Sequence, residues 1–362
     1  MNLREDIRKF IDEIIKPKVR EIDKKDVIPK ELLEKMIEKG FTTLCIPKKY
    51  GGLELDETNI CVITEEVGYT CPAIVPFLEI HMLFSNVLLL GGTEEQKEKY
   101  FKRIVNGDIA CYALTDEGAG SDPSAMKSTA EKTQNGYLIK GKKRYITFAD
   151  LADIFVVFAK TGDKISAFIV DGVEKGRGIK LEKHMQTMGL RGHRAYDLSL
   201  NVEVPKDNLI GGEGNGLRLA LETLNRTRIS LACGYIGLAR ASLDSALKFA
   251  KERYSMGKPI IEHQAVGFAL AEIATQIEAA RLLAYKAAEM SERGEKHRKE
   301  TSMAKFYAGE VMLKATTTAS RILGGFGCAE DFLVEKYVRD AYSWIFAQGA
   351  PEIQKLTILR EL

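Results

Sequence analysis

Residues 154–170 read IFVVFAKTGDKISAFIV, within a part of the chain whose residue pattern is that of β-strands. Two runs rich in β-branched and aromatic residues flank the turn sequence Thr161-Gly162-Asp163, a pattern that predicts two short strands joined by a turn. Similar runs occur at residues 136–141 and 198–204, and Asn-Gly and Gly-Arg-Gly sequences lie among the segments that separate the runs. Together these segments predict a compact antiparallel β domain over residues 112–211.

Helical periodicity lies on both sides of this β region. Apolar residues recur at spacings of three and four in residues 7–15 and again in residues 266–284, which predicts amphipathic helices. Thr93 with Gln96 three positions later predicts a capped helix start. We therefore expect an N-terminal helical domain over residues 1–111 and a C-terminal helical bundle over residues 212–362. This order argues against a doubly wound α/β sheet.

Composition excludes several classes of function. The 362 residues include 53 basic and 51 acidic side chains, a net charge of +2 that does not suggest binding to nucleic acid. The longest apolar stretch, residues 75–92, contains Glu79 and His81, so we expect no membrane span. The six cysteines form no C-x-x-C pair, which predicts no metal site and reduced thiols in a cytoplasmic compartment.

A glycine-containing loop begins the β region. Residues 112–122 read YALTDEGAGSD. Gly118 and Gly120 allow the backbone to come close to a planar ring or a phosphate, while Thr115 and Ser121 add hydroxyl donors. The loop sequence predicts a ligand-binding turn, with a purely structural loop as the alternative.

Five further segments extend this pattern along the chain: KRYIT at 143–147, MGLRGH at 188–193, LNRTRI at 224–229, KERYSMGKP at 251–259 with His263-Gln264, and RILGGFG at 321–327. In order and spacing, the six segments resemble the acyl-CoA dehydrogenase family over nearly the whole chain. The resemblance implies a mainly α protein: an N-terminal helical domain, a small antiparallel β-barrel-like domain and a C-terminal four-helix bundle. It also implies FAD, an acyl-CoA substrate, an electron-transferring flavoprotein as partner, and a homotetramer built as a dimer of dimers.

The same resemblance assigns binding residues by matched position. For FAD they are Tyr112, Leu114, Thr115, Gly120, Ser121, Tyr145, Thr147, Arg253, Ser255, Met256, His263, Gln264, Arg321, Gly324, Gly325, Ala350 and Glu352. For the acyl-CoA they are Ser121, His193, Asn225, Arg228 and Gly349. Several of these depart from the family pattern. Where the family usually has Trp, Ser, Asp and Gln, this chain has Tyr145, His193, Asn225 and Arg321, respectively.

The catalytic position departs most. Residues 344–354 read WIFAQGAPEIQ, whereas the family usually carries Tyr-Glu-Gly-Thr-Ser-Glu-Ile-Gln, with the first Glu removing the substrate α-proton. Gln348 occupies that place, and an amide has no useful basicity at neutral pH. Some family members carry the base on the helix just before the matched Arg228, and there this chain has Thr227.

Glu79 is the candidate replacement for the missing base. It lies in the apolar segment Phe77–Met82, on the helix that in the family forms the floor of the acyl pocket. Members that act on alicyclic acyl-CoA esters use a carboxylate from that region. Burial would raise the pKa of Glu79 and suit it to proton transfer. A structural carboxylate on the pocket floor is the alternative.

Three interpretations of the whole chain remain open at this point. The first is an acyl-CoA dehydrogenase with an unconventional base, acting on a cyclic or unusual acyl group. The second is a subunit that supports FAD binding in a heteromeric acyl-CoA dehydrogenase, and the third is a relative resembling flavin monooxygenases.

Overall fold

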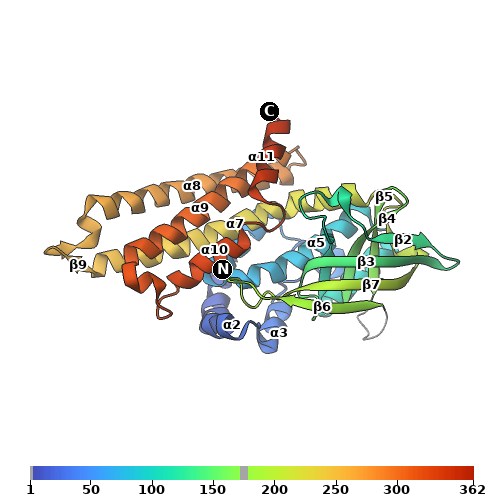
Figure 1. The fold of residues 1–362 in the computed structure, drawn as a ribbon, viewed down its shortest axis with the longest axis horizontal. Coiled ribbons are helices and arrows are strands. Elements are labelled where there is room, and N and C mark those ends of the chain that lie inside the picture. Colours follow the sequence, from blue (N-terminus) through green and yellow to red (C-terminus); the bar gives the residue numbers. More distant parts are fainter. Residues whose placement is uncertain (1–2, 172–177) are drawn as a thin grey trace.

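The computed structural model describes residues 3–171 and 178–362. Figure 1 shows the sheet at one end of the molecule and a long C-terminal helical bundle that extends to the opposite end. The N-terminal helices are α1 (Leu3–Phe10), α2 (Val19–Lys25), α3 (Lys30–Glu38), α4 (Glu57–Thr70), α5 (Val75–Gly91) and α6 (Glu94–Val105). The predicted cap is confirmed: Thr93 and Gln96 form a reciprocal capping box at the start of α6.

The middle region is an eight-stranded sheet. Its strands are β1 (Ala110–Ala113), β2 (Thr129–Lys132), β3 (Gly136–Thr147), β4 (Ile154–Thr161), β5 (Lys164–Asp171), β6 (Ile179–Met185), β7 (Ala195–Pro205) and β8 (Leu209–Ile210). They are ordered β6-β7-β3-β2-β4-β5-β8, with β1 paired to β4. The predicted β4–β5 turn is confirmed by the pairing of Thr161 with Lys164.

The expectation of a wholly antiparallel sheet is wrong at two pairings. Both β1 and β2 run parallel to β4. Antiparallel neighbours can be joined by a tight hairpin, whereas parallel neighbours need a longer connection. Here β1 enters from the N-terminal helices and β2 follows the glycine-containing loop, so neither reaches β4 through a hairpin.

The C-terminal region is helical and closely packed. It contains α7 (Gly216–Glu252), the short strands β9 (Tyr254–Ser255) and β10 (Lys258–Pro259), α8 (Gln264–Glu292), α9 (Arg298–Leu323), α10 (Val334–Trp344) and α11 (Pro351–Arg360). Helix α7 is the central element and contacts α4, α8 and α9. Its approach to α4 requires glycine, because a Cβ on Gly237 would lie 2.2 Å from the Glu65 carbonyl oxygen.

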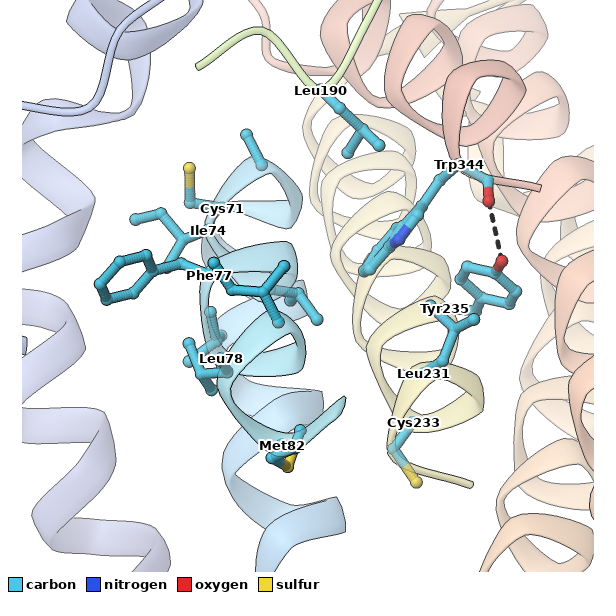
Figure 2. Packing of buried hydrophobic residues seen from close by; sticks show 14 of the residues in the cluster. Cys71, Ile74, Phe77, Leu78, Met82, Leu190, Leu231, Cys233, Tyr235 and Trp344 are labelled. Carbon is cyan, nitrogen blue, oxygen red and sulfur yellow. Dashed lines mark hydrogen bonds between the residues drawn. The ribbon is translucent and has the colours of Figure 1, made fainter. Parts of the chain in front are cut away.

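Helix α5 forms the centre of the core. The segment Pro72–Gly91 is long and apolar enough to cross a membrane, but 89% of its most apolar window is buried inside the protein. In Figure 2 the side chains of residues 71–82 lie across from those of α7 and the indole of Trp344. This burial makes α5 the core helix of the fold, and its polar members therefore lie where few other polar groups are found.

Candidate functional site

The site begins at the turn that follows α10. Gln348 has φ 52° and Gly349 has φ 106°, so both lie in the left-handed region of backbone space. Glycine adopts this conformation readily, whereas a residue with a side chain is strained there. Strained residues persist only where surrounding contacts hold them, so the contacts of this turn matter.

Two buried cations hold the turn through its carbonyl groups. Lys305 on α9 donates from Nζ to the Ile345 oxygen at 2.9 Å and to the Gly349 oxygen at 2.6 Å. Arg228 on α7 donates from Nε to the Gln348 oxygen at 2.7 Å. These three hydrogen bonds from basic side chains fix the backbone at residue 345 and at residues 348 and 349 of the turn.

The side chain of Gln348 lies between the two other positions considered for the base. Its Oε1 accepts a hydrogen bond of 2.9 Å from the Thr227 hydroxyl. Its amide also lies close enough to Glu79 to affect the ionisation of that carboxyl. The contact is a close approach rather than a well-formed hydrogen bond, since Nε2 of Gln348 and Oε1 of Glu79 both lack a partner in the described part of the chain. Residues from three separate segments thus meet in one place.

Glu79 is a buried carboxyl group with a raised pKa. Only 5% of the surface of Glu79 is exposed to solvent. Burial raises its pKa to about 8, although the neighbouring Gln348 amide and the Lys305 ammonium lower it in part. Most buried polar atoms have a partner, so an orphaned carboxyl oxygen in a core helix calls for a functional explanation.

Lys305 was missed by the sequence analysis. It is fully buried, and burial lowers its pKa to about 7, with Arg228 acting in the same direction and Glu352 and Glu79 opposing it. The signal was present, because α9 turns a face of small residues toward the bundle and Lys305 is the charged member of that face. The periodicity alone did not reveal what this lysine contacts.

Two unsatisfied polar atoms lie near Arg228. The Tyr112 hydroxyl and the Asn225 Oδ1 are both buried without a partner among residues 3–171 and 178–362. Burial lowers the pKa of Arg228 to about 10, which Tyr112 opposes, and the guanidinium stays positively charged at neutral pH. A donor, an acceptor and a cation therefore remain available to a polar ligand.

The glycine-containing loop is organised by a buried acid. Asp116 accepts from the Lys127 and Ser128 amides, each at 2.7 Å, and buried Lys143 donates to the Leu114 oxygen at 3.2 Å. A Cβ added to Gly118 or Gly120 would meet nothing within 4 Å. The outer face of the loop, with Thr115 and exposed Ser121, is thus open to a planar ring or a phosphate, as FAD requires.

The end of β3 presents an exposed aromatic ring. A bulge between Lys143 and Ile146 interrupts the pairing of β3 with β7. Within it, Tyr145 has φ 58° and is 52% exposed, while Thr147 is half-buried two residues later. The Arg144 guanidinium lies 5.3 Å from the centre of this ring, and the exposed ring on strained backbone at a sheet end fits a planar cofactor.

The remaining flavin candidates lie elsewhere in the chain. Arg253, Ser255, Met256, His263 and Gln264 belong to the β9–β10 hairpin region, at the end of the bundle far from the sheet (Figure 1).

A second group, Arg321, Gly324 and Gly325, lies at the exposed C-terminal end of α9. The two groups adjoin each other, because the Arg253 guanidinium lies 6.0 Å from the ring of Phe326. A single chain does not bring them to the glycine-containing loop.

Ala350 and Glu352, by contrast, lie beside the Gln348 turn. Ala350 immediately precedes α11, and Glu352 is in its first turn. Glu352 also acts electrostatically on Lys305.

Residues 188–193 connect different parts of the fold. The Leu190 amide donates to Asp340 at 2.7 Å, the Gly192 amide donates to Asp26 at 2.7 Å, and His193 Nδ1 contacts the Leu190 oxygen at 2.7 Å. Among the described residues, no contact joins His193 to Glu79 or Gln348. This motif binds α2, the sheet and α10 together.

Within residues 3–171 and 178–362, no three His, Cys, Asp or Glu side chains are placed to hold a metal ion.

Comparison with known proteins matches the three regions of the chain to three domain families. The N-terminal, middle and C-terminal domain families of acyl-CoA dehydrogenases match residues 1–108, 111–202 and 214–362. The caffeyl-CoA reductase–Etf complex subunit CarC of Acetobacterium woodii is 39% identical, over 93% of this chain and 91% of its own. Cyclohexane-1-carbonyl-CoA dehydrogenase of Geobacter metallireducens is 34% identical, over 99% and 96%.

One solved structure has nearly the same fold over the whole chain. Butyryl-CoA dehydrogenase from Megasphaera elsdenii superposes with a TM-score of 0.95 at 32% identity, covering 100% of this chain and 98% of that one.

Proposed function

This chain belongs to the acyl-CoA dehydrogenase family, and from that premise we propose that it dehydrogenates a cyclic or otherwise unusual acyl-CoA with Glu79 as its base. It is an FAD-binding oxidoreductase that acts on acyl-CoA. We further propose that its electrons pass to an electron-transferring flavoprotein. The similarity to a subunit of a reductase–Etf complex supports that partner.

One observation carries the assignment of the base. Glu79 is a buried carboxyl with an orphaned oxygen, and its neighbour is Gln348. We propose that Gln348 occupies the position of the family's usual base, as the sequence resemblance implies. A carboxylate there can reach the reaction centre from the pocket floor instead of from the C-terminal turn. Similarity to a dehydrogenase of cyclohexane-1-carbonyl-CoA supports an alicyclic substrate.

The residues divide the remaining tasks. We propose that Tyr112, Leu114, Thr115, Gly120, Ser121, Tyr145, Thr147, Ala350 and Glu352 hold the flavin within one chain. Bound FAD supplies the hydride acceptor for the substrate Cβ. Arg228, Asn225 and Gly349 orient the thioester, while Glu79 takes the α-proton on its free oxygen.

The protonation state of Glu79 also favours a second candidate, the reverse reaction. With a pKa of about 8, Glu79 mostly holds its proton at neutral pH. In that direction a protonated Glu79 would donate its proton to Cα, and bound reduced FAD would supply the hydride for Cβ. Similarity to caffeyl-CoA reductase supports this direction.

The separation of the flavin candidates supports an oligomer. Arg253, Ser255, Met256, His263, Gln264, Arg321, Gly324 and Gly325 would serve the flavin of a neighbouring chain, and we propose a cytoplasmic homotetramer arranged as a dimer of dimers. A heteromer remains the alternative in which this chain supports a partner's flavin.

Domain boundaries near residues 111 and 211 are proposed because β1 starts at residue 110 and α7 at residue 216.

The test is anaerobic titration of the purified flavoprotein with straight-chain, branched and cyclic acyl-CoA thioesters, followed by flavin absorbance. We expect a cyclic thioester to bleach the flavin fastest. Retained flavin that no thioester bleaches would contradict the proposal and favour the heteromer. Rapid reaction of the reduced flavin with oxygen would favour the monooxygenase-like interpretation.

A further inference from the structure

We infer that Lys305 is a positioning residue of this site: its ammonium group ties both ends of the turn at residues 345–349 and so controls how Gln348 meets Glu79. The turn carries the side chain that contacts Thr227 on one side and Glu79 on the other. The consequence for Glu79 rests on the proposed function, whereas the hold on the turn does not.

The geometry of Lys305 is that of a clamp. Its Nζ reaches the first and last carbonyl groups of the turn, 2.9 Å from Ile345 O and 2.6 Å from Gly349 O. The ring of Tyr235 lies 5.8 Å away and offers its face to the same cation. Tyr235 in turn donates from its hydroxyl to the Trp344 oxygen at 2.8 Å, as Figure 2 shows.

A stability role alone does not account for this lysine. Burying an ammonium group is unfavourable unless its donors are satisfied, and an apolar residue of similar length would fill the same space without that cost. What the apolar residue would lack is the ability to hold two carbonyl groups of a strained turn and to act on the charge of Glu79.

The charges around Lys305 come from three helices. Glu79 faces it from α5, Arg228 from α7 and Glu352 from α11. The protonated lysine favours the ionised form of Glu79 and so lowers the pKa of that carboxyl. When Lys305 loses its proton, the two hydrogen bonds to the turn weaken and this support for the Glu79 anion disappears, so both effects follow one titration.

Trp344 provides a reporter that does not depend on catalysis. It is the single tryptophan of the chain, is 1% exposed, and immediately precedes the turn. In the holoenzyme, Lys305→Met should increase acrylamide quenching of Trp344 fluorescence at least about twofold, because Ile345 loses its anchor. Lys314→Met on the same helix is the matched control, since Lys314 pairs with Glu272 at the surface and should leave Trp344 unchanged.

The second measurement is the pH profile of flavin bleaching. Lys305→Met should shift its rise to higher pH, because the pKa of Glu79 loses the lowering effect of a neighbouring cation. The shift should be a fraction of a pH unit, since Lys305 has a pKa of about 7 and keeps only part of its charge where Glu79 ionises. Lys305→Arg keeps the charge and should restore the profile even if the longer side chain disturbs the turn.

The outcomes separate the two ideas. Unchanged Trp344 quenching in both Lys305 variants overturns the inference, and so does an unshifted pH profile in Lys305→Met, which would leave only a structural anchor. If Glu79→Gln stays fully active while Lys305→Met exposes Trp344, Glu79 is not the base, but the inference that Lys305 holds the turn at residues 345–349 is supported.

Discussion

Glu79 shows how much of the chemistry depends on one side chain. Its replacement by Gln keeps the shape of the residue and removes the proton acceptor. We expect Glu79→Gln to retain FAD but to lower the rate of flavin reduction by a factor of about 10²–10⁴, the usual contribution of a general base. Stopped-flow absorbance measures that rate, and the 450-nm region reports flavin content, with about equal occupancy expected in both proteins.

Glu57→Gln is the matched control. Burial also raises the pKa of Glu57, to about 7, but its electrostatic partners are Arg226, Glu292 and Asp56 rather than Gln348. The control should retain its rate. Full activity in Glu79→Gln would exclude Glu79 as the base.

The pH dependence of the reaction follows from the same group. A base works in its ionised form, and the pKa of Glu79 is about 8. The dehydrogenation rate should therefore rise as pH increases through about 8, and the reduction of an enoyl-CoA should fall through the same pH. Rates measured in both directions from pH 6 to 9 test this, and a profile that is flat in both would be inconsistent with Glu79 as acid and base.

The sequence revealed the residues of the site more readily than their contacts. Glu79 was identified because a carboxylate in an apolar helix is unusual, and Gln348 because it departs from a known pattern. The meeting of these two with Thr227 depends on three segments that are far apart in the chain. Lys305 escaped because periodicity shows that a position is buried, not which carbonyl groups surround it.

Among the secondary-structure elements, α10 supports the turn at residues 345–349, because its side chains fix the helix that precedes this turn. Lys336 and Asp340 form a fully buried ion pair within it, and Asp340 also accepts from the Leu190 amide. Arg339 adds contacts to Asp23 on α2 and to the Met188 oxygen. One helix thus connects the N-terminal helices, the sheet and the turn at residues 345–349.

Removing one member of the buried pair should be costly. Lys336→Met leaves Asp340 buried without its cation, and we expect a loss of about 3–5 kcal/mol in the free energy of unfolding. Chemical denaturation measures the loss. The exposed Lys286→Met on α8 is the comparison and should change stability by less than about 0.5 kcal/mol. A loss as small as that in Lys336→Met would contradict a supporting role for the pair.

The elements themselves were mostly predictable. Alternating or β-branched runs identified β3, β4, β5 and β7, and capping residues identified the start of α6, because both signals are local in the sequence. The remaining strands of the sheet, β1, β2, β6 and β8, were not identified. The direction of β1 and β2 was not predictable from the same signals. It depends on where the chain enters the sheet, which is a property of the long connection and not of the strands.

At the scale of the whole molecule, the flavin candidates lie at two ends of one chain. We predict that each flavin uses Glu79 from one chain and Arg321 from its neighbour. Glu79→Gln and Arg321→Ala should each be inactive alone. When the two variants are co-expressed and purified as a mixed oligomer, activity should return, because half of the sites in a mixed pair are intact.

The measurement is turnover per bound flavin in tandem-tagged mixed oligomers. Separately purified variants that are only combined in the assay provide the control for slow subunit exchange. If the mixed oligomer is as inactive as its parents, the flavin site lies within one chain.

The burial of α5 has a consequence for how the protein is made. This helix is as apolar as a membrane span, and the residues that cover it include Leu231, Tyr235 and Trp344, which leave the ribosome more than a hundred residues later (Figure 2). The first half of the chain therefore cannot complete its core during synthesis. Until α7 and α10 have been synthesised, the nascent chain exposes the apolar surface of α5, to which a chaperone can bind. For the same reason, chains that terminate before α7 expose this surface and are prone to aggregate.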